Sequence, residues 1–276
     1  MGLHQSLLRL IGFLTCINIP VQAFAASALL LDSSATYLLP LDFHENVSQP
    51  FLSTKAGSTN YTAQLESAAK VPFVAFDNEF LDFLPPNASL QLVANASYPF
   101  ADEMGVWVWD RNEVWFTGPT INESNYLTVL DLDTMRVYEP QTSIPVVNPN
   151  GGYYHEGVVY VAADGNATSA PAIYGVDPAT GEARVVVDSY FGLRLNGPND
   201  VTWTNCGDGS YMFFTDDPLS ALYNGGSLPQ LPDAVWRFDP QQKTLLPVID
   251  QSDISVPNGI RVNKDCLLYT SPSPRD

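Results

Sequence analysis

One short pattern recurs four times in this sequence and constrains the fold more than any other feature. In each copy, polar or small residues stand directly before an apolar strand. The copies are Glu103-Met104-Gly105-Val106-Trp107, Glu156-Gly157-Val158-Val159-Tyr160, Asn199-Asp200-Val201-Thr202-Trp203 and Asn258-Gly259-Ile260-Arg261-Val262. Successive copies begin 53, 43 and 59 positions apart. A repeat of about this length, built from four short strands, is typical of β-propeller blades.

A second pattern, a strand that ends in an aspartate turn, alternates with the first. It occurs at residues 129–133, 173–178 and 235–240, and outer strands are expected at 185–187 and 245–249. No amphipathic helical pattern of ten residues or more follows residue 25, which argues against a parallel α/β fold. A β-sandwich is the structural alternative, but it would not show the repeated motif. The sequence therefore predicts an all-β propeller, with four units in residues 103–265 and the fourth incomplete.

The polar residues that precede the repeated strands are the candidate functional residues. In a propeller, the innermost strand of each blade runs along the central channel, and the residues before it lie at one mouth. Glu103, Asn199 and Asn258 occupy such positions and offer hard oxygen donors, suited to Ca²⁺, Mg²⁺ or Mn²⁺. These three are the predicted metal ligands, and Asn199 and Asp200 are the catalytic candidates. Asp200 is expected chiefly to orient its turn, and Asp216 either to support the residues of the site or to be structural.

Three of these segments also carry a resemblance to a known family. The motifs N-x-P-N-D at 196–200, F-T-D at 214–216 and P-N-G-I at 257–260 follow one another in order. Together they resemble the SMP-30/gluconolactonase/lactonohydrolase group of metal-dependent lactonases, in its fungal-type secreted form, over about residues 72–265. Each motif alone is an ordinary turn sequence. The resemblance implies a six-bladed β-propeller, incomplete here, with about four blades present.

The same resemblance implies roles for particular residues. Metal ligands would fall on Glu103 and Asn258, with Asn199 at the metal or the substrate. The family's further Asp, a metal ligand and its usual general-base candidate, would lie in a later blade. Fungal members often carry His before the Glu, where this chain has Asp102. The implied cofactor is a divalent metal, with Ca²⁺ first and Mg²⁺, Mn²⁺ or Zn²⁺ as alternatives.

The function implied is hydrolysis of a sugar-type lactone to its hydroxy acid by a secreted enzyme. A paraoxonase-like or strictosidine-synthase-like propeller enzyme is one alternative, and a non-catalytic secreted propeller that binds a partner or glycan is another. No G-x-S-x-G elbow, H-E-x-x-H motif or dinucleotide glycine motif is present. His155 and Glu156 are expected to line the substrate pocket or to be structural. The substrate, the native metal and the oligomeric state are left open.

The start of the chain predicts secretion. Residues 1–25 resemble a signal peptide, with an apolar core at 10–23 and the cleavage site Ala23-Phe24-Ala25. No other stretch is long and apolar enough to span a bilayer. Residues 26–71 are interpreted as an N-terminal extension with one or two strands, and 72–83 as a strand pair or outer strand of the propeller. N-glycans are expected at some of the six N-x-S/T sequons, at Asn46, Asn60, Asn87, Asn95, Asn122 and Asn166.

The net charge limits the partners that this chain would bind. Twelve basic and 30 acidic residues give a formal charge of −18. Such a surface repels phosphate backbones and anionic lipids, so neither nucleic acid nor a membrane is an expected partner. The expected partner is a small-molecule lactone.

The last eleven residues, 266–276, resemble a translated sequencing-library adaptor. We therefore expect the natural reading frame to leave this sequence near Asp265, and the chain to be a C-terminally truncated fragment without lactonase activity of its own. Cys206 would then be the one cysteine of the mature fragment, either a free thiol or a residue whose partner lies in the missing part.

Overall fold

A computed structural model of the chain describes residues 28–31, 33, 59–85, 87–121, 124–207, 209–219, 221, 228–263 and 268–272. The chain forms two compact units, Met1–Leu92 and Val93–Asp276. The proposed signal peptide and the sequons at Asn46 and Asn122 lie outside the described residues. Among the described helices, none is long and apolar enough to cross a membrane.

The N-terminal unit is a small α/β arrangement. Strand β1 (Ala28–Leu30) pairs in parallel with β2 (Phe73–Ala75), accompanied by helices α1 (Thr59–Ala68) and α2 (Asn78–Phe83). One strand of the expected extension is present as β1, but helices α1 and α2 were not predicted, α2 occupies part of the segment expected as a strand pair, and residues 73–92 group with this unit rather than with the propeller. Helix α2 begins at a local signal, because Asp77 caps it by accepting a hydrogen bond from the Glu79 backbone N–H at 2.9 Å.

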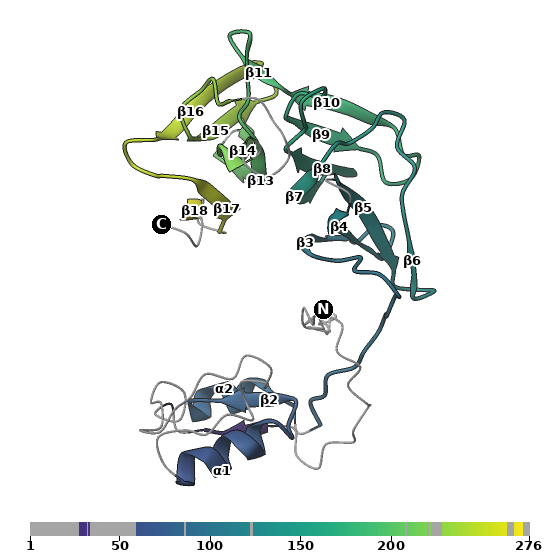
Figure 1. Cartoon of the computed structure of the whole chain (residues 1–276), viewed down its shortest axis with the longest axis vertical. Helices are drawn as coiled ribbons and strands as arrows, with labels where there is room; N and C mark the ends of the chain where they lie inside the picture. The colour runs from purple at the N-terminus through teal and green to yellow at the C-terminus, as the bar shows by residue number, and fades with distance from the viewer. Residues whose placement is uncertain are drawn as a thin grey trace. The chain divides into compact units, whose positions relative to one another are not determined.

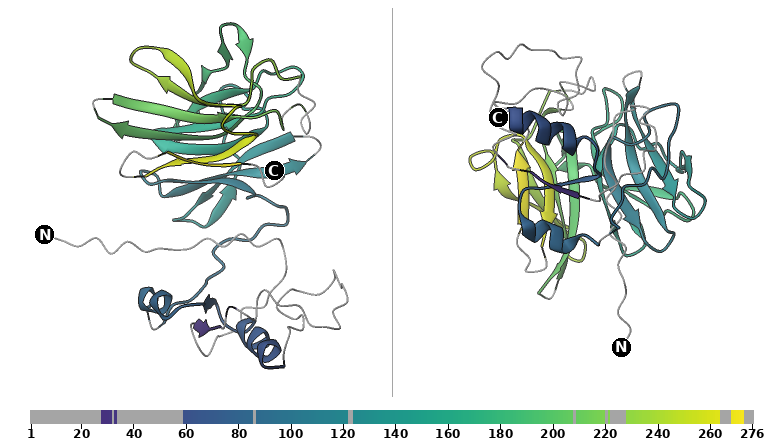
Figure 2. Two further views of the ribbon diagram at one scale, coloured as in Figure 1. Left: turned by 90° about the vertical axis from the view of Figure 1, so that its left-hand side faces the viewer. Right: turned by 90° about the horizontal axis from the view of Figure 1, so that it is seen from below.

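The second unit consists of consecutive antiparallel sheets (Figures 1 and 2). The first sheet contains β3 (Glu103–Val108), β4 (Glu113–Ile121), β5 (Ser124–Asp131) and β6 (Arg136–Tyr138). The second contains β7 (Pro149–His155), β8 (Val158–Ala163), β9 (Ala172–Val176) and β10 (Ala183–Val187). The third contains β13 (Pro198–Cys206), β14 (Gly209–Asp216), β15 (Ala234–Asp239) and β16 (Thr244–Asp250). A two-stranded sheet follows, of β17 (Pro257–Val262) and β18 (Leu268–Pro272), and a small hairpin, β11 (Ser189–Tyr190) with β12 (Leu193–Arg194), precedes β13.

Each four-stranded sheet is an up-and-down meander in which sequence neighbours pair, and the first strands of successive sheets contact one another. Strand β7 contacts both β3 and β13, and β13 contacts β17. This is the blade arrangement of a propeller, with β3, β7, β13 and β17 innermost. The predicted all-β propeller is confirmed, with three whole blades and two strands of a fourth in the described residues. Strand β18 lies within the segment 266–276.

The blades are held together by strands that are apolar on both faces. On β8, Val159 and Val161 pack into the hydrophobic core between the first and second blades. Tyr160 and Ala162 pack into the hydrophobic core between the second and third blades. Because side chains alternate along a strand, a blade between two others buries both faces. This explains why β8 reads as a continuous apolar run rather than as an alternating pattern.

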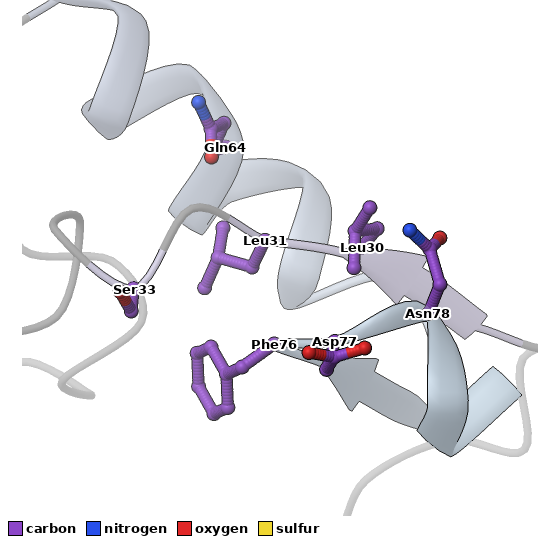
Figure 3. Close-up of a pocket in the computed structure, with 7 residues that line it drawn as sticks. All are labelled: Leu30, Leu31, Ser33, Gln64, Phe76, Asp77 and Asn78. Atoms are coloured by element: carbon purple, nitrogen blue, oxygen red, sulfur yellow. The ribbon is translucent and has the colours of Figure 1, made fainter.

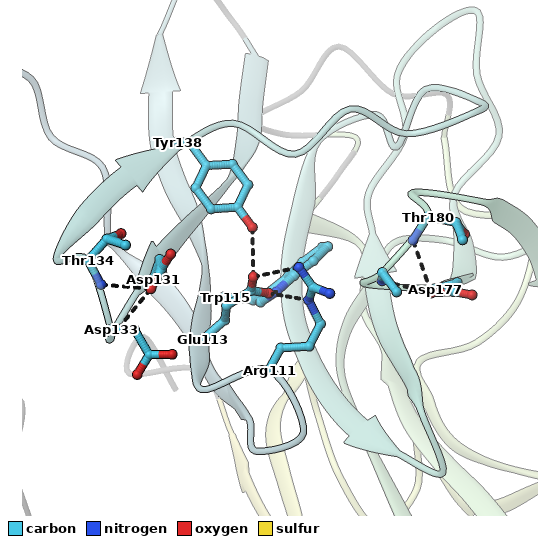
Figure 4. Close-up of polar contacts among 10 residues, drawn as sticks. Arg111, Glu113, Trp115, Asp131, Asp133, Thr134, Tyr138, Asp177 and Thr180 are labelled. Atoms are coloured by element: carbon cyan, nitrogen blue, oxygen red, sulfur yellow. Dashed lines mark hydrogen bonds and ion pairs between the residues drawn. The ribbon is translucent and has the colours of Figure 1, made fainter.

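Each whole blade closes its last hairpin with the predicted aspartate turn. Asp131 Oδ1 accepts hydrogen bonds from the backbone N–H groups of Asp133 at 2.8 Å and Thr134 at 3.0 Å (Figure 4). Asp177 and Asp239 each accept the same two bonds, from the second and third residues that follow them. The carboxylate stands in for the backbone acceptor of the turn, so the repeated Asp fixes the hairpin geometry.

A buried carboxylate anchors the outer part of the first blade (Figure 4). Glu113 is 4% exposed and accepts two bonds from the Arg111 guanidinium, each of 3.0 Å. It also accepts a bond from Tyr138 Oη at 3.0 Å and one from Trp115 Nε1 at 3.3 Å. Both carboxylate oxygens of Glu113 thus accept hydrogen bonds, and the bond from Tyr138 joins β4 to β6.

Replacing Glu113 with Ala should destabilise the protein by about 2–4 kcal/mol, because the Trp115 and Tyr138 donors would lose their acceptor inside the blade. Urea unfolding followed by tryptophan fluorescence measures this change. The exposed Glu182→Ala variant is the control and should stay within about 0.5 kcal/mol of wild type. Equal stability of the two variants would contradict an anchoring role.

Candidate metal and substrate site

The four innermost strands share one irregularity at their first residues. Between two paired positions, three steps on the inner strand face two steps on its neighbour, so each inner strand carries one extra residue. The first paired positions are Glu103 with Thr117, Pro149 with Ala163, Pro198 with Asp216 and Pro257 with Pro272. The next are Val106 with Trp115, Gly152 with Val161, Val201 with Phe214 and Ile260 with Thr270. Such bulges change the direction of side chains and are common beside active sites.

The shared register defines which residues are equivalent. Two residues of each inner strand lie inside the bulge: Met104-Gly105, Asn150-Gly151, Asn199-Asp200 and Asn258-Gly259. The predicted equivalence of Asn199 and Asn258 is therefore confirmed. Glu103 stands one residue earlier, level with the prolines of the other blades, and Met104 takes the asparagine position with a φ of 74°.

The second copy of the sequence pattern was assigned to the wrong strand. Glu156 and Gly157 form the turn between β7 and β8, both with positive φ, and β8 is the second strand of its blade. The innermost strand is β7, so the true counterpart of Asn199 in this blade is Asn150. The sequence pattern failed here because polar residues precede any strand that follows a hairpin turn, whereas β7 is rich in Gly and Tyr and less apolar than β8.

His155 ends β7 and lies at the opposite end of this strand from Asn150. Its ring stacks on Trp203 with centroids 4.7 Å apart, and its Nε2 lies 3.3 Å from Ser210 Oγ. Burial lowers the pKa of His155. A cavity of about 280 Å³ adjoins it, lined by residues from the ends of β7, β13 and β17: Tyr153, His155, Trp203, Thr204, Asn205, Val262 and Asn263. The structure therefore does not bring His155 or Glu156 together with the candidate ligands, since five residues of strand span roughly 17 Å.

Glu103 lies in a negatively charged part of the other mouth. Its pKa is raised, first by partial desolvation and then by the carboxylates of Asp102 and Asp200. Glu103 begins β3 and the turn at 199–200 lies at the start of β13, so both lie at the same mouth although two blades separate them along the chain. Several carboxylates near one another favour a bound cation.

The side chains of Asn199 and Asn258 make no hydrogen bond with another described residue, and Asn199 is only 8% exposed. Their backbones, in contrast, are fixed. Thr215 Oγ1 accepts a hydrogen bond from the Asp200 backbone N–H at 3.0 Å and donates one to the Asn258 carbonyl oxygen at 2.6 Å. Thr215, the central residue of the F-T-D motif, therefore joins the bulges of the third and fourth blades. Sequence analysis assigned no role to Thr215, although its motif pointed to the segment.

Asp200 joins the same two blades. Its Oδ1 accepts a bond from the Val201 N–H at 2.8 Å, and its Oδ2 accepts from the Ile260 N–H at 3.0 Å and Arg261 Nη1 at 2.7 Å. Burial raises the pKa of Asp200, while Arg261 opposes that rise. Both oxygens are occupied, so these contacts fit the expected role in orienting the turn better than a role as catalytic base.

Asp216 and Asp217 form a buried acidic pair behind this mouth. Asp216 accepts bonds from the backbone N–H groups of Asn196 and Gly197, which agrees with its expected structural role, and burial raises its pKa to about 7. Asp217 is 1% exposed, and its Oδ2 has no hydrogen-bond partner among the described residues. Burial, followed by the charges of Asp164, Asp216 and Asp233, raises the pKa of Asp217 to about 8.

The described residues contain no group of three or more His, Cys, Asp or Glu that could hold a metal ion. A cation at the mouth would therefore depend on amide oxygens in addition to Glu103. A second cavity, of about 490 Å³, lies within the N-terminal unit and not among these residues (Figure 3). It is lined by Leu30, Leu31, Ser33, Gln64, Phe76, Asp77 and Asn78.

Comparison with known proteins agrees with the motifs. No protein-family model matches the chain. The sequence is 28% identical to lactonohydrolase oryH of Aspergillus oryzae over 169 residues, which cover 57% of this chain and 36% of that protein. It is 29% identical to a gluconolactonase of Zymomonas mobilis over 191 residues, which cover 60% of this chain and 49% of that protein. The chain thus spans between about a third and a half of the length of these relatives.

Solved structures support the same architecture. A structure assigned to the gluconolactonases matches with a TM-score of 0.58 and 24% identity, over 72% of this chain and 64% of that one. A gluconolactonase from Xanthomonas campestris matches with a TM-score of 0.50 and 21% identity, over 64% of this chain and 56% of that one. These likenesses show the fold. The sequence relatives add that the chain is similar to lactonohydrolases and gluconolactonases, and this supports the resemblance to SMP-30/gluconolactonase-like propellers.

The buried acidic pair predicts that stability falls as the pH rises from about 4 to about 8. In this window the folded protein keeps protons on Asp216 and Asp217 that the unfolded chain has released, because an unfolded Asp has a pKa of about 3.9. The folded state therefore binds more protons, and the free energy of unfolding decreases with rising pH.

Asp217→Asn keeps the shape of this side chain and stays neutral. Its melting temperature should exceed that of wild type by roughly 3 °C or more at pH 8, with a much smaller difference at pH 4.5. Differential scanning calorimetry at both pH values measures this, with the exposed Asp253→Asn as control. The same difference from wild type at both pH values would show that Asp217 does not titrate in this range.

Proposed function

We propose that this protein is a secreted, metal-dependent lactone hydrolase, which converts a sugar-type lactone to its hydroxy acid. The observation that carries the proposal is the placement of Glu103 and two equivalent asparagines, Asn199 and Asn258, at the same end of three inner strands, β3, β13 and β17. The sequence relatives named lactonohydrolase and gluconolactonase supply the reaction class.

The donor set suits a hard divalent cation, with Ca²⁺ preferred. Glu103 offers a carboxylate, and the Asn199 and Asn258 amides make no hydrogen bond with another described residue, so their oxygens are available. Ca²⁺ accepts carboxylate and amide oxygens together in flexible geometry, and the nearby charges of Asp102 and Asp200 favour its approach. When bound there, a divalent cation polarises the lactone carbonyl and stabilises the oxyanion that forms on it.

The residues of the chain would then hold the cation and the substrate in place for the reaction. Water adds to the carbonyl carbon, the ring ester C–O bond breaks, and the departing alkoxide takes up a proton to give the hydroxy acid. In this arrangement Asn199 holds the cation or the substrate, and Glu103 holds the cation. Asp200 and Thr215 fix the backbones that carry Asn199 and Asn258 through their contacts with β17.

Secretion and glycosylation are part of the proposal. The leader at residues 1–25 would direct export. Of the sequons in the described residues, Asn60, Asn87 and Asn95 are exposed and would accept glycans. Asn166 is less suited, because its Oδ1 accepts hydrogen bonds from the backbone N–H groups of Thr168 and Ser169.

In the intact protein, of which this chain is expected to be a fragment, Glu103→Gln should abolish most of the activity while leaving the fold intact, because it removes the one charged ligand proposed in this chain. Glucono-1,5-lactone hydrolysis, followed with a pH indicator, should fall on the order of 100-fold or more, and chelator treatment of wild type should have the same effect until Ca²⁺ is restored.

The matched control is Glu156→Gln, since Glu156 is exposed and lies at the far end of β7. It should retain wild-type turnover. Chelator-resistant turnover would rule out metal dependence, and wild-type activity in Glu103→Gln would remove Glu103 from the site. Metal binding without any lactone turnover would favour the non-catalytic binding propeller.

A further inference from the structure

We propose that Asn150 is an additional ligand at this mouth, and that its amide oxygen binds the same cation as Glu103, Asn199 and Asn258. The inference rests on the proposed metal site and extends it to the second blade, which the sequence pattern had left without a ligand.

The first argument is register. In the bulge of β7, Asn150 holds the position that Asn199 holds in β13 and Asn258 holds in β17. Because the bulges insert one residue at the same step, they should direct the equivalent side chains in the same way. Three neighbouring blades thus present the same amide at the same level.

The second argument is proximity. A Cβ atom added to Gly151 would lie 2.5 Å from Asp200 Oδ1 and 2.6 Å from the Asn199 carbonyl oxygen. A Cβ atom added to Gly152 would lie 2.5 Å from Met104 Cε. The bulge of β7 is therefore packed directly between those of β3 and β13, and only glycine permits this approach. Asn150, the residue before Gly151, is placed between the first and third blades.

The third argument is the contrast between two nearby asparagines. Asn148 is fully buried, its Oδ1 accepts from the Asn125 N–H at 2.9 Å, and its Nδ2 donates to the Gly165 carbonyl at 2.7 Å. These bonds fix the turn that enters β7. Asn150 is half-buried, and its amide makes no hydrogen bond with another described residue. The chain thus holds the backbone rigid while leaving the second amide available to a ligand.

The chemistry fits a large oxygen-seeking cation. Ca²⁺ takes six to eight oxygen ligands, more than Glu103, Asn199 and Asn258 supply, and neutral amides add ligands without adding repulsion. The equivalent position in the first blade is Met104, whose thioether is a poor ligand for hard cations. Asn150 is therefore the remaining amide of the described inner strands at this level.

The test is cation binding by the full chain, measured without substrate by Ca²⁺ calorimetry and by Tb³⁺ luminescence. Asn150→Ala should weaken binding about tenfold or more, with the melting temperature in chelator unchanged. Asn150→Asp should bind at least as tightly as wild type, because a carboxylate oxygen replaces the amide oxygen. The exposed Asn95→Ala is the matched control and should bind as wild type does.

The outcomes separate this inference from the proposed function. If Glu103→Gln loses binding while Asn150→Ala keeps the wild-type dissociation constant, Asn150 is not a ligand and the proposed site stands. If Asn150→Ala and Asn150→Asp are both weakened and both melt lower in chelator, its role is structural and the inference fails. If the wild-type protein binds no cation, both this inference and the proposed metal site fail.

Discussion

The contact between the bulges of neighbouring inner strands determines the geometry of the candidate site. Asp200 binds the backbone of Ile260 and the side chain of Arg261, and Thr215 binds the carbonyl of Asn258. These bonds join residues of different blades, so they fix the level at which one strand lies beside the next. Without them, the amides of Asn199 and Asn258 would have no fixed separation.

The blades supply the rigid support that such a site requires. Strand β8 buries Val159 toward one neighbour and Tyr160 toward the other, so displacement of a blade would expose apolar surface on both sides. The candidate ligands lie at the starts of the inner strands, where they do not interrupt this packing. The apolar interior thus provides stability, so the amides of Asn199 and Asn258 at the mouth need no hydrogen-bond partner among the described residues.

Much of the fold could be predicted from the sequence, because a propeller repeats its signals. The turns at Asp131, Asp177 and Asp239 depend on hydrogen bonds between residues close in the chain, so the local sequence is enough to predict them. The equivalence of Asn150 with Asn199 was missed, because Gly151 and Gly152 serve a close approach between strands that no local pattern encodes. Helix α1 was missed as well, since the buried residues described in it, Leu65 and Ala68, give it little amphipathic pattern. That the oxygens of Glu103, Asn199 and Asn258 meet at one cation stays a prediction.

Anomalous diffraction from crystals containing Mn²⁺ or Tb³⁺ tests this central claim most directly, because it locates the ion without reference to activity. The account predicts one strong peak at the mouth formed by the starts of β3, β7, β13 and β17, within about 2.1–2.6 Å of oxygens from Glu103, Asn199 and Asn258. A peak elsewhere on the protein, with these three side chains bound to no ion, would contradict it.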